Sequence, residues 1–181
     1  MNKLKTVAII ITHNRSKLLK RCLINLKEQT KKIDTILVVD NGSTDDTQEI
    51  LKELKIKSIK QGNLGSAGGW NVGLKYAIKN GFDTAWLMDD DGYPDKKAYE
   101  ILSKSFTTKM SCVSSVVINE LDKSKFVFPY PFLNKEGLPK IGFNKPNISL
   151  VSKLSNFCVD DLYPWAQLFN GALISIKSVK K

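Results

Sequence analysis

The sequence has few of the residues that build metal or redox sites from soft ligands. Its 181 residues include three cysteines and one histidine. The cysteines form no C-x-x-C pair, and their odd number argues against a disulfide framework. A single histidine, His13, is too few for a zinc site with several histidine ligands. A Ser-His-Asp triad would have to use His13, and the G-x-S-x-G motif is absent. We therefore expect reduced thiols and neither zinc nor disulfide chemistry.

Long apolar runs are also absent. No stretch approaches the roughly 18 residues that a transmembrane helix needs. The apolar run near the N-terminus covers only residues 7–11, which is shorter than the core of a signal peptide, about 7–15 residues. We therefore expect a cytosolic protein. Hydrophobic residues make up 42% of the chain and charged residues 25%, as in an ordinary globular protein, and the length suits a single domain.

Arginine is scarce in a basic chain. Of the 28 Lys and Arg residues, only Arg15 and Arg21 are arginines, and the formal charge is +10. Proteins that read nucleic-acid sequence depend on arginine for bidentate contacts. A lysine-rich excess is more typical of a solvated surface, so we expect no nucleic-acid partner. Nucleic-acid binding stays open as an alternative, which steeply salt-dependent retention on DNA or RNA would support.

Strand-like and helix-like patterns alternate along the first part of the chain. Strands are predicted at residues 7–12, 33–40, 56–60, 83–88 and 112–118, the first two of them buried. Amphipathic helices are predicted between them, the last at about 95–106. This alternation predicts an α/β fold with a mostly parallel central sheet and helices on both faces. Residues 120–165 hold five of the six prolines and show poor periodicity, and a strand-like pattern returns at 168–176. We divide the single domain into residues 1–118 and 119–181.

Three of the predicted strands end in polar clusters. These clusters are Thr12-His13-Asn14, Asp40-Asn41-Gly42-Ser43 and Asp89-Asp90-Asp91. Each one alone resembles an ordinary turn, because turns are rich in Asn, Asp, Gly and Ser. Parallel strands, however, present their carboxyl ends at one edge of the sheet, where α/β proteins bind ligands. The three clusters together therefore predict a binding site at that edge.

The triple aspartate is the most informative cluster. Three adjacent carboxylates repel one another unless a cation or solvent relieves the repulsion. Strand alternation would place Asp89 and Asp91 on one face and Asp90 on the other. Two hard carboxylate ligands with open positions suit Mg²⁺ or Mn²⁺ shared with a diphosphate. The alternative is a solvated acidic turn.

A glycine-rich segment covers residues 62–69. It contains neither G-x-G-x-x-G nor G-x-x-x-x-G-K-[ST], so it supports neither a Rossmann dinucleotide site nor a P-loop. What it predicts is a flexible backbone that opens a helix, approaches a ligand closely and offers it N–H donors.

Four segments resemble a known family. VAIIITHNR, ILVVDNGSTDDT, NLGSAGGWNVGL and TAWLMDDDGYP, in this order, resemble family 2 glycosyltransferases of the GT-A fold. The glycine-rich segment and the triple aspartate together are similar to the subset that contains galactofuranosyl- and rhamnosyltransferases. The resemblance covers residues 5–118 strongly and 160–176 weakly.

The resemblance implies a metal-dependent inverting transfer of a sugar in cell-surface polysaccharide synthesis. The donor would be a nucleoside-diphosphate sugar, UDP- or dTDP-linked, and the acceptor a saccharide or a lipid-linked acceptor. The cofactor would be Mn²⁺ or Mg²⁺. A lipid-linked acceptor would bring the protein to the inner face of the membrane as a peripheral protein.

The resemblance also implies roles for particular residues. Asp89 and Asp91 would hold the divalent ion, and Asp90 would face the ribose or sugar. Trp165 would offer an apolar face to an acceptor sugar, with a core aromatic as the alternative. For His13 two alternatives stay open: it stacks on a base, or it is a plain loop residue. The remaining donor-site residues would be Thr12, His13 and Asn14 at the nucleoside, Asp40 at the base or ribose, and Asn63, Gly65, Gly68, Gly69 and Asn71.

One departure from the family concerns the general base. An inverting transfer needs a base to take the acceptor proton, and in this family it lies in an acidic motif beyond the strand that matches residues 168–176. The sequence has no such motif before Lys181, and Asp160 and Asp161 precede that strand. We therefore assign no catalytic base and expect it beyond Lys181, in a chain truncated at its C-terminus. A nucleotide-sugar binding module without turnover is the alternative. A nucleotidyltransferase is a further one, disfavoured because its N-terminal glycine-rich signature is absent.

Overall fold

The computed structural model describes residues 4–107, 109–139, 147–154, 156, 158, 163, 165–168 and 171–179. The chain divides into two compact units, Met1–Ser115 with Leu168–Lys181, and Val116–Gln167. The predicted functional division at residue 118 stays a prediction. In the structure, the segment after residue 167 belongs to the first unit.

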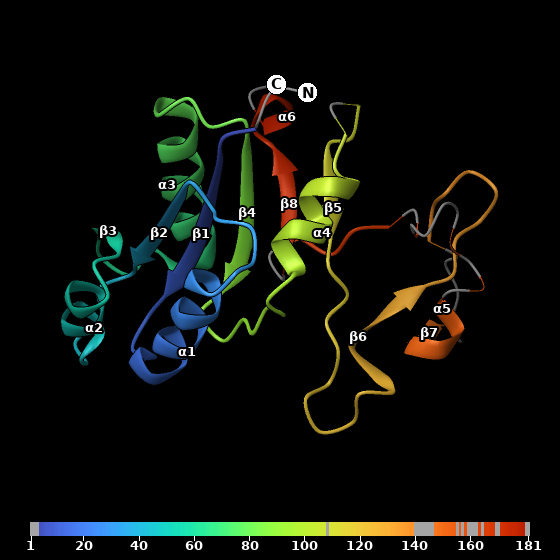
Figure 1. The fold of residues 1–181 in the computed structure, drawn as a ribbon, viewed down its shortest axis with the longest axis horizontal. Helices are drawn as coiled ribbons and strands as arrows, with labels where there is room; N and C mark the ends of the chain where they lie inside the picture. Colours follow the sequence, from blue (N-terminus) through green and yellow to red (C-terminus); the bar gives the residue numbers. More distant parts are fainter. Residues whose placement is uncertain are drawn as a thin grey trace. The chain divides into compact units, whose positions relative to one another are not determined.

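A six-stranded sheet forms the centre of the first unit (Figure 1). Its order is β3-β2-β1-β4-β8-β5. The strands are β1 (Thr6–Thr12), β2 (Thr35–Asp40), β3 (Lys57–Lys60), β4 (Thr84–Asp89), β5 (Cys112–Ser114) and β8 (Ala172–Ser175). The helices are α1 (Ser16–Lys27), α2 (Thr47–Glu53), α3 (Gly65–Lys79), α4 (Ala98–Ser105) and α6 (Ile176–Val179).

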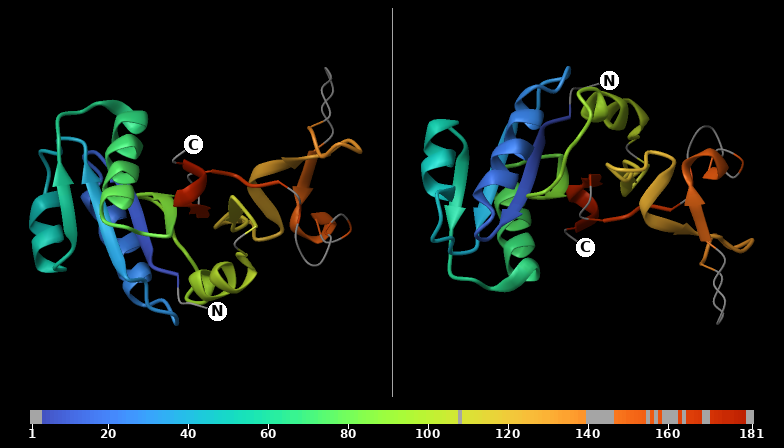
Figure 2. Two further views of the ribbon diagram at one scale, coloured as in Figure 1. Left: turned by 90° about the horizontal axis from the view of Figure 1, so that it is seen from above. Right: turned by 90° about the horizontal axis from the view of Figure 1, so that it is seen from below.

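The sheet is mostly parallel and is covered on both faces. Strands β3, β2, β1 and β4 are parallel neighbours, whereas β8 runs antiparallel to β4 and β5. Helix α3 lies on one face of the sheet, and α1 and α4 lie on the other (Figure 2). The predicted α/β class is confirmed.

Strand β1 explains why both faces need a helix. All seven of its residues are buried. Val7, Ile9 and Ile11 belong to the core cluster on the α3 side. The alternate residues Ala8 and Ile10 are also fully buried. A continuous apolar strand of this kind has no solvated face, so it becomes a central strand of a parallel sheet.

Two predicted strands are shorter than the sequence pattern indicated. The strand predicted at 112–118 ends at Ser114, because the backbone beyond it pairs elsewhere. The N–H of Val127 donates to the carbonyl of Val117, and the N–H of Asn119 donates to the carbonyl of Lys125. The strand predicted at 168–176 covers Ala172–Ser175.

The glycine-rich segment is not a loop throughout. Helix α3 begins at Gly65, so residues 65–69 form its first turns. The close packing of this helix on β1 explains why glycines are found in it. A Cβ atom on Gly69 would lie 2.6 Å from Cγ2 of Ile11, and one on Gly73 would lie 2.5 Å from Cγ2 of Ile9. The missing side chains let α3 lie directly on β1, and this contact compensates for the low helix propensity of glycine.

The second unit has a small core of its own. Strands β6 (Lys125–Pro131) and β7 (Asn147–Leu150) pair antiparallel, and α5 (Val151–Leu154) follows β7. Phe126, Tyr130, Ile148 and Leu154 form a buried cluster. Burial raises the pKa of Tyr130 to about 12. Across the described parts of both units, no helix has the length and apolar character to span a membrane.

Candidate functional site

The polar ends of three neighbouring strands meet at one edge of the sheet. In the register of the sheet, Thr12 of β1 pairs with Asp40 of β2, and Ile11 of β1 pairs with Asp89 of β4. The three polar clusters are therefore side by side, as the strand pattern predicted.

A cleft of about 290 Å³ opens at this edge. Six of the predicted site residues line it: Thr12, His13, Asn63, Gly65, Asp89 and Asp90. Four further lining residues had no individual role predicted: Ile11, Arg15, Asn41 and Ser66. Of these, Asn41 and Ser66 lie in segments that were predicted to form the site. Arg15 could have been found from the sequence, because it is one of two arginines and directly follows a predicted site residue.

Residues Asp89, Asp90, Asp91 and Gly92 form a turn at the end of β4, called the aspartate turn below. Asp89 is the last strand residue, and the N–H of Gly92 donates to its carbonyl at 3.0 Å. The alternation of side chains between the two faces of the strand therefore ends at Asp89. Asp90 is buried, with 4% of its surface exposed, whereas half of the Asp91 side chain is exposed.

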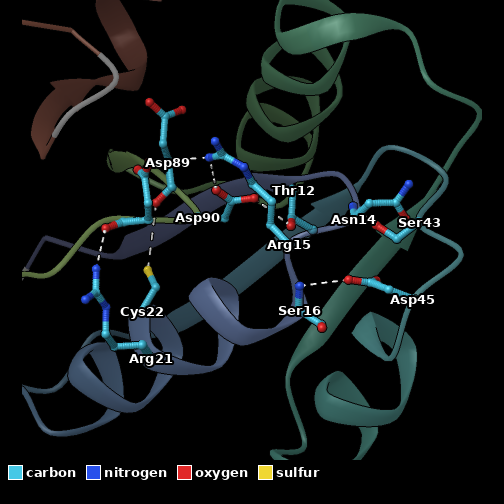
Figure 3. Close-up of polar contacts among 11 residues, drawn as sticks. Thr12, Asn14, Arg15, Ser16, Arg21, Cys22, Ser43, Asp45, Asp89 and Asp90 are labelled. Carbon is cyan, nitrogen blue, oxygen red and sulfur yellow. Dashed lines mark hydrogen bonds and ion pairs between the residues drawn. The ribbon is translucent and has the colours of Figure 1, made fainter.

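Asp90 is held by two hydrogen bonds. The Thr12 hydroxyl donates to its Oδ2 at 2.8 Å, and Nη1 of Arg15 donates to its Oδ1 at 2.9 Å (Figure 3). The same Arg15 nitrogen lies 3.3 Å from Oδ2 of Asp91. The hydrogen bond and the charge of Asp90 raise the pKa of Arg15, and Asp91 adds to this.

Asp89 is in an unfavourable environment for a carboxylate. Burial raises its pKa, and repulsion from Asp91 and Asp90 raises it further, while Arg15 partly opposes the shift. The surroundings of Asp89 in the described part of the chain therefore disfavour its charged form.

Helix α1 contacts the turn at two further points. The guanidinium of Arg21 lies 4.8 Å from the ring centre of Tyr93, and its Nη2 lies 3.5 Å from the carbonyl of Asp91. The Cys22 thiol lies 3.9 Å from the carbonyl of Asp89 (Figure 3). Burial raises the pKa of Cys22 to about 12, with repulsion from Asp90 and Asp91 contributing. This thiol stays protonated at neutral pH and is poorly suited to act as a nucleophile.

The loop after β1 is joined to the loop after β2. Asn14 has a left-handed backbone, with φ at 53°. Its Oδ1 accepts a hydrogen bond from the N–H of Thr44, and its own N–H donates to the Ser43 hydroxyl. A ring nitrogen of His13, Nδ1, lies 2.9 Å from the carbonyl of Asn41. Asn14 does not line the cleft, because its side chain connects the two loops.

Asp40 is also absent from the cleft wall. It is fully buried. Its carboxylate accepts hydrogen bonds from the N–H of Ser43 and from the Gln48 amide. The next residue, Asn41, does line the cleft, and its Nδ2 donates to the carbonyl of Gly65 at 3.0 Å. Asn41 thereby fixes the start of α3 beside the end of β2.

Asp91 and the other remaining predicted residues are not among those that line the cleft. Gly68 packs against Leu64, and Gly69 against Ile11 and Asn41. Asn71 is exposed on α3. Trp165 belongs to the second unit and is 37% exposed. Asp160 and Asp161, which we left unassigned, are outside the described residues.

Comparison with known proteins identifies the family of this chain. Residues 7–159 match the family described as glycosyl transferase family 2. The chain belongs to this family. It is 33% identical over 177 residues to galactofuranosyltransferase GlfT1 of Mycolicibacterium smegmatis, covering 95% of this chain and 56% of that protein. It is 32% identical over 174 residues to GlfT1 of Mycobacterium tuberculosis H37Rv, covering 92% and 54%. The chain thus spans about half the length of these relatives.

Solved glycosyltransferases share the fold. The structure matches Staphylococcus aureus TarS 1-349 in complex with UDP with a TM-score of 0.62 and 18% identity, covering 98% of this chain and 48% of that one. It matches the mannosyltransferase PcManGT of Pyrobaculum calidifontis, in complex with GDP-Man and Mn²⁺, with a TM-score of 0.58 and 21% identity, covering 65% and 36%. At these identities the matches establish the GT-A fold.

Proposed function

We propose that this member of the family binds a nucleoside-diphosphate sugar in the cleft and transfers the sugar, with inversion, to an acceptor hydroxyl. One observation carries the proposal: Thr12, His13, Asn63, Gly65, Asp89 and Asp90 line a single cleft. These residues come from three separate segments, and Asn41 adds a fourth, at the strand ends where α/β proteins bind ligands.

The cleft suits a diphosphate. Arg15 lines it and supplies a planar cationic donor group. Gly65 and Ser66 line it at the start of α3, where the first N–H groups of a helix have no partner within the helix and favour an anion. The N–H of Gly65 is already engaged by Oδ1 of Asn63. The N–H groups that follow Gly65 are therefore the proposed donors to the diphosphate.

We propose that a divalent ion binds between Asp89, which lines the cleft, and the neighbouring Asp91. The described residues contain no group of three or more His, Cys, Asp and Glu side chains placed to hold an ion. In the proposed site the two carboxylates would be the protein's ligands. Diphosphate oxygens and water would complete the shell, as Mg²⁺ sites commonly do. The crowded Asp89 carboxylate fits this proposal, because a divalent ion would stabilise its charged form. Bound there, the ion would neutralise the leaving diphosphate as the bond to the sugar breaks.

The relatives suggest the substrates. We propose galactofuranose as the sugar because the GlfT1 proteins, named galactofuranosyltransferases, align with nearly the whole chain. We propose uridine as the first nucleoside to test, since TarS was solved with UDP. A saccharide or lipid-linked acceptor of cell-surface polysaccharide synthesis, with Trp165 as a sugar platform, completes the proposal. We also propose that the protein is cytoplasmic and contacts the membrane peripherally.

The first test is calorimetric binding of UDP, dTDP, GDP and CDP with and without Mn²⁺. We expect one nucleotide to bind tightly only with Mn²⁺ and Asp91→Ala to abolish this gain. At 100 times its dissociation constant the nucleotide should add about 2.7 kcal/mol to the free energy of unfolding. Glu136→Ala removes an exposed carboxylate in the second unit and should bind like the unaltered protein. Equal binding by Asp91→Ala would contradict the assigned metal role.

A product assay then separates the three activities. Nucleoside diphosphate released together with a glycosylated acceptor indicates glycosyl transfer. Inorganic diphosphate indicates nucleotidyl transfer, and tight binding without product indicates a nucleotide-sugar binding module.

A further inference from the structure

Arg15 forms ion pairs with two carboxylates of the aspartate turn, Asp90 and Asp91. The three carboxylates of the turn place three negative charges close together. The guanidinium of Arg15 compensates one of them. The same atom of Arg15, Nη1, contacts both carboxylates: it lies 2.9 Å from Asp90 and 3.3 Å from Asp91. Figure 3 shows the Arg15 side chain extending from the start of α1 to the turn.

The two contacts of Arg15 differ in how firmly they are held. The Asp90 side chain is 5% exposed and is also hydrogen-bonded by Thr12. The Asp91 side chain is 50% exposed, and its contact with Arg15 is longer. Exposed charge pairs contribute little free energy, whereas a buried carboxylate keeps its partner. The contact with Asp91 is therefore the one that can be exchanged.

We propose that Arg15 is a resident counter-ion that competes with the divalent ion for Asp91. This inference rests on the proposed function, in which Asp91 is a metal ligand. When the ion binds, Nη1 leaves Asp91 and keeps Asp90. Arg15 therefore lowers the affinity of the protein for the free ion, because the ion must displace one positive charge and then lie close to it.

Calorimetric titration with Mn²⁺ alone tests the competition. Arg15→Gln removes the guanidinium and should tighten Mn²⁺ binding by about three- to fivefold, the effect of losing one partly exposed charge pair. Lys17→Gln is the matched control, since it removes the same charge from an exposed position on α1. Arg15→Lys should lie between Arg15→Gln and the unaltered protein. Mn²⁺ binding by Arg15→Gln that is no tighter than by Lys17→Gln overturns the proposal.

A second measurement uses the unaltered protein and does not depend on how the variants fold. The chain has two arginines, so its ¹⁵N spectrum contains two arginine Nε–H signals, which Arg21→Lys assigns. Titration with diamagnetic Mg²⁺ should move the Arg15 signal far more than the Arg21 signal, with the same midpoint as Mg²⁺ binding. An Arg15 signal that stays in place while the ion binds overturns the inference and leaves the proposed function standing. No binding of Mn²⁺ or Mg²⁺ with UDP present overturns both.

Discussion

Asp45 shows how a single carboxylate organises the loops beneath the site. Its Oδ2 accepts a hydrogen bond from the N–H of Ser16, at the start of α1 (Figure 3). Its Oδ1 accepts one from the hydroxyl of Thr47, at the start of α2. One side chain thus caps α1 from another loop and contacts the first residue of α2. Because Arg15 directly precedes α1, Asp45 also helps to fix the backbone that carries Arg15.

The pKa of Asp45 gives a pH-dependent prediction. Burial by itself raises this pKa, but the hydrogen bonds from Thr47 and Ser16 outweigh burial and lower it from 3.8. A carboxyl whose pKa is lowered by folding stabilises the fold above its unfolded pKa and loses that contribution as the pH falls through the folded value. We expect Asp45→Asn to cost about 1 kcal/mol at pH 7, as the loss of a helix cap does.

Urea unfolding at a series of pH values measures this effect. The difference between the unaltered protein and Asp45→Asn should shrink as the pH is lowered below 3.8. Asp46→Asn is the control, because Asp46 is exposed and makes no side-chain cap to α2. A difference that stays constant with pH would show that Asp45 acts by its shape and not by its charge.

At the scale of elements, the distance between α3 and β1 depends on glycine. Gly69 and Gly73 lie where the helix meets Ile11 and Ile9, and Ile11 also lines the cleft. The packing of one helix on one strand therefore shapes both the core and a wall of the site.

Gly73→Ala tests this packing. Its Cβ would lie 2.5 Å from Cγ2 of Ile9, and overpacking of this kind costs about 1–3 kcal/mol. Gly62→Ala is the control, because no atom lies within 4 Å of its added Cβ. Chemical unfolding should show Gly73→Ala clearly destabilised and Gly62→Ala within about 0.5 kcal/mol of the unaltered protein. Equal stabilities for the two variants would mean that α3 can move away from β1 at little cost.

At the scale of the whole molecule, the two units have cores of different size. The described core on the α3 face of the first unit includes residues from β1, β2, α3, β4 and β8. That of the second unit centres on four buried residues of β6, β7 and α5. Regions with fewer buried apolar contacts open at a lower free energy.

Native-state hydrogen exchange measures that difference. Amides of β6 and β7 should exchange at lower denaturant concentration than amides of β1 and β4, because less apolar surface stabilises the smaller unit. A common denaturant dependence in all four strands would show instead that the chain unfolds as one cooperative body.

The sequence by itself determined the strand order along the chain and the polar strand ends. Strand β1 has no polar residue between Val7 and Ile11, and such a run is stable only when both faces are covered. Asp89, Asp90 and Asp91 could be found because three adjacent carboxylates are rare after a buried strand. The motifs that carried the family resemblance lie in these same segments, and the family match confirms the resemblance.

Only the tertiary structure decided which polar residues face the cleft. Asp40 and Asn14 have the residue types of a ligand site, yet Asp40 accepts hydrogen bonds from Ser43 and Gln48, and Asn14 accepts one from Thr44 of the next loop. Arg15 and Asn41 line the cleft instead. The physical reason is that a hydrogen bond depends on where separate loops meet in space, at distances that sequence spacing does not encode. Strand periodicity stops at Asp89 for the same reason, since the turn beyond it is shaped by Thr12 and Arg15 of another segment.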